Sequence, residues 1–369
     1  MTEPTPNPHE VEVAVDVDVV IVGAGAGGLL AACELAAGGM SVRVLESRSR
    51  SGGRLLSTTH DDMGVDLGAT WFWPSEPMIN QLVQKLDIAT HSQHIAGDAM
   101  YHDRPESQRL DGNPLDVPSG RFSKGADHLT TALADLLPTG TVSFDSPVDE
   151  ISIGETSATV RFGGTEIRCS HAVVAVPPAL AVDAIAFTPP LPDSVASLCA
   201  ATPVWMGTTT KVAAIYPRAF WRDNGLSGSA ISHLGPMREI HDMSGPHGSP
   251  AVLFGFAPHT AELTETAVTD QLAEIFGPDA GAPTKVIVQN WQQERWTTPA
   301  GAEHLTDYQT YGHRLFQSPV LHGRLHWAST ETSPHSPGHI EGALAAGRRA
   351  ATTIRTTLDP SNEQRDTHA

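Results

Sequence analysis

Hydrophobic and polar positions near the start of the chain predict a strand, a helix and a second strand in close succession. Residues 19–22 (VVIV) form a continuous apolar run, which is expected of a strand buried on both faces. Residues 26–37 are rich in Ala and Leu and predict a helix. Residues 41–46 predict the second strand. This order is typical of an α/β nucleotide-binding domain.

Later segments predict a second domain that is richer in strands. Four β-like runs, VDEISI, ATVRF, EIRCS and AVVAV, lie within 141–176 and end at Pro177 and Pro178. The run FTPPLP at 187–192 predicts a linker. The remaining pattern predicts strands around Lys211 and near 229–234, 251–256, 285–291 and 324–329, and helices near 76–86, 126–137, 261–276 and from 340 onward.

Composition narrows the class of protein. Lys and Arg number 23 against 42 Asp and Glu, and the net charge of −19 argues against a nucleic-acid or anionic-membrane partner. Three widely spaced cysteines without a CxxC pattern favour a reducing compartment. The acidic, Pro-rich start does not resemble a signal peptide, and no apolar run could span a bilayer. These features predict a cytoplasmic protein and leave its oligomeric state open.

Histidine spacing gives little support for a metal. His91 and His94, or His335 and His339, have a spacing that a metal could use. No HExxH pattern or Cys/His set accompanies either pair, so we expect no metal site.

Glycines 23, 25 and 28 form a GxGxxG pattern between the first predicted strand and helix. Gly23 would make the tight turn, Gly25 would let the backbone approach a pyrophosphate, and Gly28 would let the helix pack closely. The helix N-terminus would offer N–H groups to the phosphates. Glu46, at the end of the second predicted strand, could accept hydrogen bonds from both ribose hydroxyls, which disfavours NADP. The pattern predicts dinucleotide binding.

The next residues resemble a known family. SRSRSGGR at 47–54 is similar to the E-x-R-x-R-x-GGR signature of flavin amine oxidases, DMGVDLGATWF at 62–72 to their loop beside the flavin ring, and 326–351 to their C-terminal signature. The resemblance implies a Rossmann-like FAD-binding domain of the glutathione-reductase type, interleaved with a strand-rich α+β substrate domain. It implies FAD contacts at Arg48, Gly53, Arg54, Gly68, Ala69, Thr70, Val148, Glu331 and Ile340.

Lys211 lies in the run TTTKVAAIYPRAFW, where a strand would place it on one face with Ala213 and Ile215. It could be a charge at an exposed strand edge, half of an ion pair, or a catalytic group. The chain has only four lysines, so lysine is not scattered freely. The longer run PVWMGTTTKVAAIYPRAFW resembles the family segment whose lysine hydrogen-bonds, through a water, to flavin N5. The resemblance therefore implies that Lys211 is catalytic.

The family resemblance implies the oxidation of a small-molecule amine. A hydride would pass to flavin N5, the imine would be hydrolysed to an aldehyde or ketone, and dioxygen would yield hydrogen peroxide. Ala300 lies near the position where relatives with covalent flavin have a cysteine, so we expect non-covalent FAD. The substrate pocket is expected to include Trp71, Trp296 and His339. Desaturation, porphyrinogen-type oxidation on the same fold, and a non-catalytic dinucleotide-binding protein are the alternatives.

The expected domain division follows from these motifs. Residues 1–16 would be a disordered tail. The FAD-binding domain would comprise 17–75, 121–186 and 310–369, and the substrate-binding domain 76–120 and 187–309.

Overall fold

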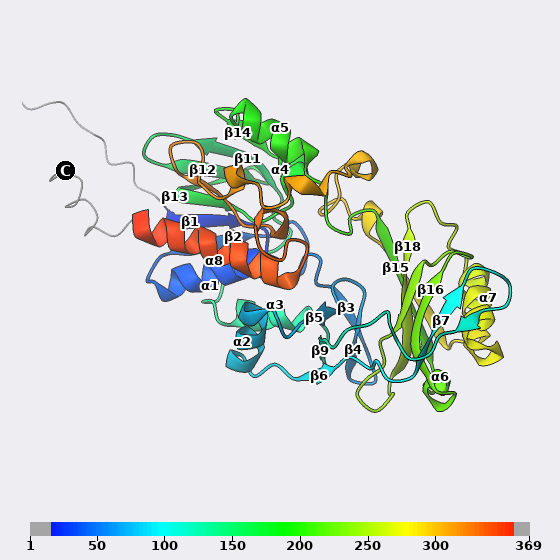
Figure 1. Ribbon diagram of the computed structural model, residues 1–369. Helices are drawn as coiled ribbons and strands as arrows, with labels where there is room; N and C mark the ends of the chain where they lie inside the picture. Colours follow the sequence, from blue (N-terminus) through cyan, green and yellow to red (C-terminus); the bar gives the residue numbers. More distant parts are fainter. Residues whose placement is uncertain (1–15, 358–369) are drawn as a thin grey trace, which may run out of the picture.

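Two large β-sheets organise the chain, one in each half of the molecule (Figure 1). The structure is a computed structural model that describes residues 16–357. Residues 1–15 of the expected tail and 358–369 of the expected FAD-binding domain lie outside this range.

The first sheet contains the predicted nucleotide-binding unit. Its order is β10 (Val142–Ser143), β2 (Val42–Leu45), β1 (Val17–Val22), β13 (Thr165–Val174), β12 (Ala158–Phe162), β11 (Val148–Ile153) and β14 (Ala186–Thr188), and β20 (Leu325–Trp327) also pairs with β13. Strands β10, β2, β1, β13 and β20 are parallel to their neighbours in that group, whereas β12 pairs antiparallel with β11 and β13. This is the mixed α/β arrangement that the sequence predicts.

Helices cover both faces of this sheet (Figure 1). On one side lie α1 (Ala26–Ala37), α2 (Pro77–Lys85), α3 (His128–Asp135) and α8 (Ile340–Thr357), and on the other α4 (Pro178–Ala184) and α5 (Asp193–Ala201). Val19 and Ile21 of β1 enter the first core, and Val20 and Val22 enter the second. The apolar run at 19–22 is therefore buried on both faces, as its composition predicts.

The second sheet is largely antiparallel. Its order is β19 (Lys285–Asn290), β15 (Thr209–Tyr216), β18 (Ala251–Pro258), β17 (Glu239–Asp242), β16 (Leu226–Ser232), β7 (Asp98–His102) and β8 (Gln108–Arg109). Val212 and Leu253 face the core that includes α7 (Glu265–Phe276), with α6 (Phe220–Asp223) nearby. Ala213 and Phe254 face the other way, and pack against Val65 of β4 (Met63–Asp66). One face of the sheet thus meets the first half of the molecule.

Short elements complete the described chain. β3 (Ser57–His60) pairs with β4, and β5 (Trp71–Phe72), β9 (Gly120–Phe122) and β6 (Thr90–Ser92) form a small sheet. The 3-10 helices are Pro278–Gly281, Trp291–Gln293, Ala302–His304, Tyr308–Thr310, Arg314–Phe316 and Thr330–Thr332.

The structure departs from the sequence prediction in several places. EIRCS and AVVAV are one strand, β13, because its residues pair continuously with β12 and then β1. FTPPLP is not only a linker, since β14 ends within it and α5 follows. Strand β17 was not predicted. Residues 77–88 and 191–199 contribute side chains to the two cores beside the first sheet, and the division into two domains stays a prediction.

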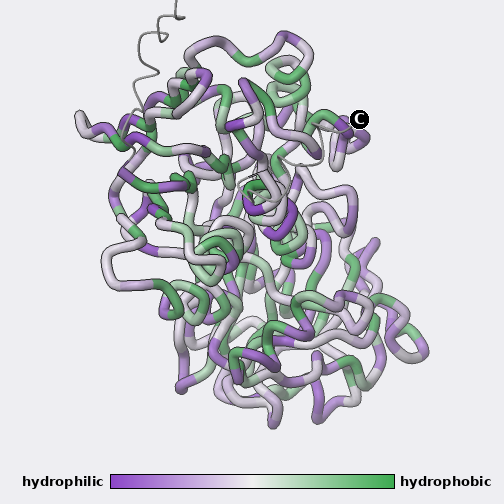
Figure 2. Tube along the Cα trace, turned by 90° about the vertical axis from the view of Figure 1, so that its left-hand side faces the viewer, coloured by the Kyte–Doolittle hydropathy of each residue, from purple (hydrophilic) through white to green (hydrophobic). Residues whose placement is uncertain are grey.

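Hydrophobic residues occur in short stretches throughout both halves (Figure 2). Within residues 16–357, no helix combines the length and the apolar character needed to cross a membrane.

Close backbone approach joins α1 to α8. A Cβ added at Gly347 would lie 2.1 Å from the carbonyl oxygen of Gly27. A Cβ added at Gly27 would lie 2.4 Å from the oxygen of Ala328 and 2.7 Å from that of Ala343. The two helices can pack at this distance only because both positions are glycine.

We therefore predict that Gly347→Ala lowers the free energy of unfolding by about 2 kcal/mol, the usual scale of overpacking. Urea denaturation measures the change. Thr352→Ala, at an exposed position of the same helix, should leave stability unchanged or slightly raised. Equal effects of the two substitutions would contradict this account of the contact.

Candidate active site

A cavity of about 540 Å³ is lined by residues from both halves of the molecule. Most of the predicted site residues line it: Gly23, Gly25, Glu46, Arg48, Gly53, Arg54, Gly68, Ala69, Thr70, Trp71, Val148, Lys211, Trp296, His339 and Ile340. Gly28 and Glu331 do not. Segments that lie far apart in the sequence therefore meet around one space of the size that small-molecule sites occupy.

The glycine turn between β1 and α1 fits a phosphate group. Gly23 has φ +104°, which favours glycine, and a Cβ at Gly28 would lie 2.1 Å from the Gly23 oxygen. A Cβ at Gly25 would meet nothing closer than the Gly52 oxygen at 3.9 Å. Gly28 thus serves helix packing, whereas Gly25 leaves space beside the N-terminus of α1, where N–H groups can bind an anion.

Glu46 is held in a fixed orientation directly after β2. Its Oε2 accepts a hydrogen bond from the Ala24 N–H at 2.8 Å, and its Oε1 accepts one from the Arg48 N–H at 2.9 Å. The residue is buried yet lines the cavity. Val148, at the start of β11, lines the same region. This end of the cavity can therefore offer a carboxylate to a ribose.

The two arginines of the second motif have different partners. Arg48 donates to Glu294 at 3.1 Å and to Thr297 Oγ1 at 2.7 Å, which ties it to the segment containing Trp296. Arg54 forms a two-pronged pair with Glu331, with N···O distances of 2.6 and 3.1 Å. Burial lowers the pKa of Arg54, but Glu331 raises it overall. Since Glu331 is fully buried and does not line the cavity, it acts here by holding Arg54.

Lys211 is neither exposed nor at a sheet edge. It lies on β15, an inner strand, with 1% of its surface exposed. Its Nζ donates to the Gly68 carbonyl at 2.9 Å and to Thr70 Oγ1, and lies 4.2 Å from the centre of the Phe254 ring. Burial lowers the pKa of Lys211 to about 7, against the opposing effect of Asp66. Both hydrogen-bond acceptors are uncharged, so the exposed-charge and ion-pair alternatives do not describe it.

His339 lies just before the N-terminus of α8 and forms part of the cavity wall. Its Nδ1 is 2.6 Å from Oε1 of the buried Glu76, and its ring lies 4.8 Å from that of Trp73, centre to centre. Glu76 Oε2 accepts a hydrogen bond from the Trp73 N–H. Nothing in the sequence signals the contact of Glu76 with His339, because the two residues are 263 positions apart.

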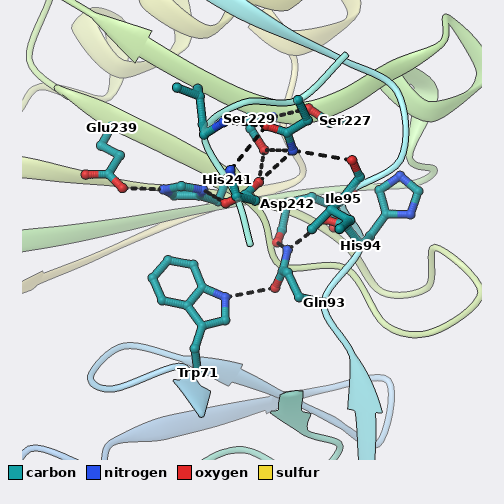
Figure 3. Close-up of polar contacts among 12 residues, drawn as sticks. Trp71, Gln93, His94, Ile95, Ser227, Ser229, Glu239, His241 and Asp242 are labelled. Atoms are coloured by element: carbon teal, nitrogen blue, oxygen red, sulfur yellow. Dashed lines mark hydrogen bonds and ion pairs between the residues drawn. The ribbon is translucent and has the colours of Figure 1, made fainter. Parts of the chain in front are cut away.

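Another charged residue that lines the cavity, Glu239, has no signal in the sequence (Figure 3). His241 lies between Glu239 and Asp116, with Nε2 2.8 Å from Glu239 Oε1 and Nδ1 2.7 Å from Asp116 Oδ1. Burial alone would lower the pKa of His241, but the two carboxylates raise it overall. The pKa of Asp116 is lowered although burial opposes this, because His241 hydrogen-bonds to it. The cluster therefore carries a buried imidazolium between two carboxylates.

Trp71 lies between this cluster and the first half of the molecule (Figure 3). Its indole N–H donates to Gln93 Oε1 at 2.9 Å, and its ring contacts that of His241 edge-on at 5.0 Å. Trp71, Phe256 and Trp296 give the cavity aromatic walls on more than one side. Within the described residues, no group of His, Cys, Asp and Glu side chains could hold a metal ion.

Comparison with known proteins identifies the family. Residues 119–355 match the family described as flavin containing amine oxidoreductase, and residues 21–86 match an NAD(P)-binding Rossmann-like domain. The chain belongs to the flavin containing amine oxidoreductase family.

The names of individual relatives indicate different substrates. Putrescine oxidase from Kocuria rosea is 27% identical, with 89% of this chain and 92% of that protein covered. Flavin-containing amine oxidase B from Sus scrofa is 30% identical over 63% of this chain and 46% of its own length. An L-amino acid dehydrogenase from Synechocystis is 28% identical over 68% of this chain and 52% of its own. The chain thus spans about half the length of several curated relatives that it matches.

A solved structure confirms the predicted fold class. Cyclohexylamine oxidase from Brevibacterium oxydans superposes with a TM-score of 0.81 at 24% identity, over 93% of this chain and 100% of that one. At this identity the likeness establishes the fold alone. Flavin chemistry therefore follows from the family and not from this likeness.

The pKa of Lys211 yields a prediction about stability. Below pH 7 Lys211 is protonated in both the folded and the unfolded state. The free energy of unfolding is then lowered by the whole cost of burying the ammonium. Between about pH 7 and pH 10 the lysine stays protonated in the unfolded state but loses its proton in the folded state. The free energy of unfolding of the wild-type protein therefore increases as pH rises. The stability of Lys211→Met relative to wild type should therefore fall from pH 6 to pH 9.

Urea unfolding at a series of pH values tests this. Lys285→Met, at an exposed position on the neighbouring strand β19, is the matched control and should show no such trend. A difference between wild type and Lys211→Met that stays constant with pH would mean that the lysine titrates normally.

Proposed function

We propose that this protein is an FAD-dependent amine oxidase that uses dioxygen as the electron acceptor. The observation that carries the proposal is that Lys211, a buried lysine with a lowered pKa, shares one cavity with a dinucleotide-binding turn. Membership of the family supports FAD as the dinucleotide. When bound, FAD supplies the acceptor for the hydride that leaves the carbon next to the amine, and dioxygen regenerates it with release of hydrogen peroxide.

The proposed roles of the cofactor-binding residues follow their positions. Gly25 and the N-terminus of α1 would receive the pyrophosphate, and Glu46 the ribose. Arg54, held by Glu331, would face phosphate oxygens. The segment Gly68–Thr70 would lie against the flavin ring, and the first N–H groups of α8 near Ile340 would face its N1/O2 edge.

Lys211 would hold a water beside flavin N5. Its ammonium donates to Gly68 O and Thr70 Oγ1, so its position is fixed on the segment that would lie against the ring. A donor fixed in advance in a buried site stabilises developing charge at little reorganisation cost.

The substrate would be an amine bound between aromatic walls. Trp71, Trp296 and Phe256 exclude water, which favours the neutral amine that hydride transfer requires. Lys211 and Glu239 each pair in register with Phe256 from opposite sides, which sets them two strands apart, roughly 10 Å. Glu239 adds negative charge there, which favours substrates that carry an amine over those that carry a carboxylate. This observation speaks against an amino acid as substrate.

A direct test adds a panel of amines to purified, FAD-loaded protein without oxygen. We predict loss of the flavin absorbance with at least one amine, and hydrogen peroxide once air is admitted. Lys211→Met should fold and stay yellow, but flavin reduction or reoxidation should slow about 10²-fold, or ~2.7 kcal/mol of barrier. Lys285→Met is the control. Stopped-flow traces identical for all three proteins would remove Lys211 from the mechanism, and an unreactive wild type would contradict the proposed function.

The flavin should be bound without a covalent link. The chain has three cysteines, Cys33, Cys169 and Cys199, and none of them lines the cavity. Acid precipitation of the yellow protein should therefore release all of the FAD into the supernatant. Yellow colour that stays with the precipitated polypeptide would disprove non-covalent binding.

A further inference from the structure

His339 is oriented by contacts on three sides. Its Nδ1 lies 2.6 Å from Glu76, its ring stacks at a tilt on Trp73, and its carbonyl accepts a hydrogen bond from Thr330 Oγ1 at 2.9 Å. The preceding residue, Gly338, has φ +85° and lies so close to Trp205 that a Cβ would be 2.7 Å from its ring. The position of the imidazole in the cavity wall is thus fixed.

The contact with Glu76 determines which ring nitrogen of His339 is available to accept a proton. A carboxylate only accepts hydrogen bonds when ionised, so Nδ1 carries the proton that it donates to Glu76. In the neutral ring, Nε2 then keeps its lone pair, and no described residue forms a hydrogen bond with it. A carboxylate that sets the tautomer of a histidine in this way produces a proton acceptor at the opposite nitrogen.

An amine oxidase can use such an acceptor to form the neutral amine. A simple alkylamine has a pKa near that of lysine, about 10.4, so at pH 7 roughly one molecule in two thousand is neutral. The ammonium form has no lone pair with which to expel a hydride from the adjacent carbon. A base in the cavity would let the abundant ammonium form bind and react.

Other basic or charged groups of the cavity are already engaged. Lys211 donates to Gly68 and Thr70, Glu239 is bound to His241, and Glu46 accepts from two backbone N–H groups at the other end. Glu341, on α8 beside His339, accepts from the N–H groups of Met78 and Ile79. Glu76 is the charged group in contact with the His339 ring.

We propose that His339 is the base that deprotonates the substrate ammonium, with Glu76 as its positioning residue. The N–H bond of the ammonium breaks, its electron pair stays on the amine nitrogen, and the proton moves to His339 Nε2. This role rests on the proposed amine oxidase function. Proton transfer of this kind contributes about 10²–10⁴-fold to rate.

The first test compares amines of one skeleton but different basicity. At pH 7 an alkylamine is protonated, whereas its β,β,β-trifluorinated analogue is largely neutral and needs no base. His339→Phe and His339→Gln should lower kcat/KM about 10²-fold for the alkylamine and less than about 3-fold for the weakly basic analogue. The loss for the alkylamine should shrink as pH rises. His335→Gln, an exposed histidine in the same loop, is the control.

Glu76→Gln should give a smaller loss with the same dependence on basicity and pH. If the His339 variants lose the same kcat/KM for all amines and at all pH values, His339 only shapes the pocket, and the proposal is overturned. A basicity-dependent loss in Lys211→Met with none in His339→Gln would also overturn it, because it would make Lys211 the base.

A second measurement does not need turnover. A primary amine with a tert-alkyl group, such as tert-butylamine, has no hydrogen on the carbon next to nitrogen, so it can bind but cannot be oxidised. Adding it to protein labelled with ¹⁵N-histidine should move the Nε2 resonance of His339, assigned by its loss in His339→Gln, to the protonated position. An Nε2 resonance that stays at its neutral position with the amine bound would contradict the proposal. The proposed function fails separately, if no amine in the panel is oxidised.

Discussion

The candidate site depends on one buried contact between the two halves of the molecule, that of Lys211 with the Gly68–Thr70 segment. The ammonium reaches from the second sheet to this segment of the first half, and it lies over Phe254. Removing a charge from water is costly, and two uncharged acceptors and an aromatic face offset this only in part. The lowered pKa expresses the remaining cost. Hydrophobic packing of Val65 against the same sheet face holds the arrangement together.

The first half of the site could be predicted because its chemistry is local. The turn at Gly23–Gly28 and the carboxylate of Glu46 lie within one β–α–β unit, and each has a conformational or hydrogen-bonding reason to be where it is. Lys211 could be placed on a strand from its neighbours, but its burial could not. That burial depends on which sheet face meets the first half, a contact that period-two alternation does not identify.

The unpredicted residues lack such a local signal: Glu76 and Asp116 have partners that are distant in sequence, and Glu239 lies on a strand that has no hydrophobic pattern. Strand β17 has only four residues, EIHD, and three of them are polar, so no hydrophobic alternation marks it. Its pairing with β18 nevertheless makes it a strand, and residues two apart on a strand, such as Glu239 and His241, lie on the same face of the sheet. Asp116 completes the cluster from a loop, and no sequence spacing indicates that contact.

Two histidines near the cavity show how hydrogen bonding divides their roles. His241 is buried, and both of its ring nitrogens are bound to carboxylates, so its proton is retained and it acts as a fixed positive charge. His339 lies on a partly exposed cavity wall, with one nitrogen bound to a carboxylate and no hydrogen bond from residues 16–357 to the other. The same residue type is therefore structural where both nitrogens have carboxylate partners, whereas His339 keeps one nitrogen without such a partner, as the proposed proton transfer requires.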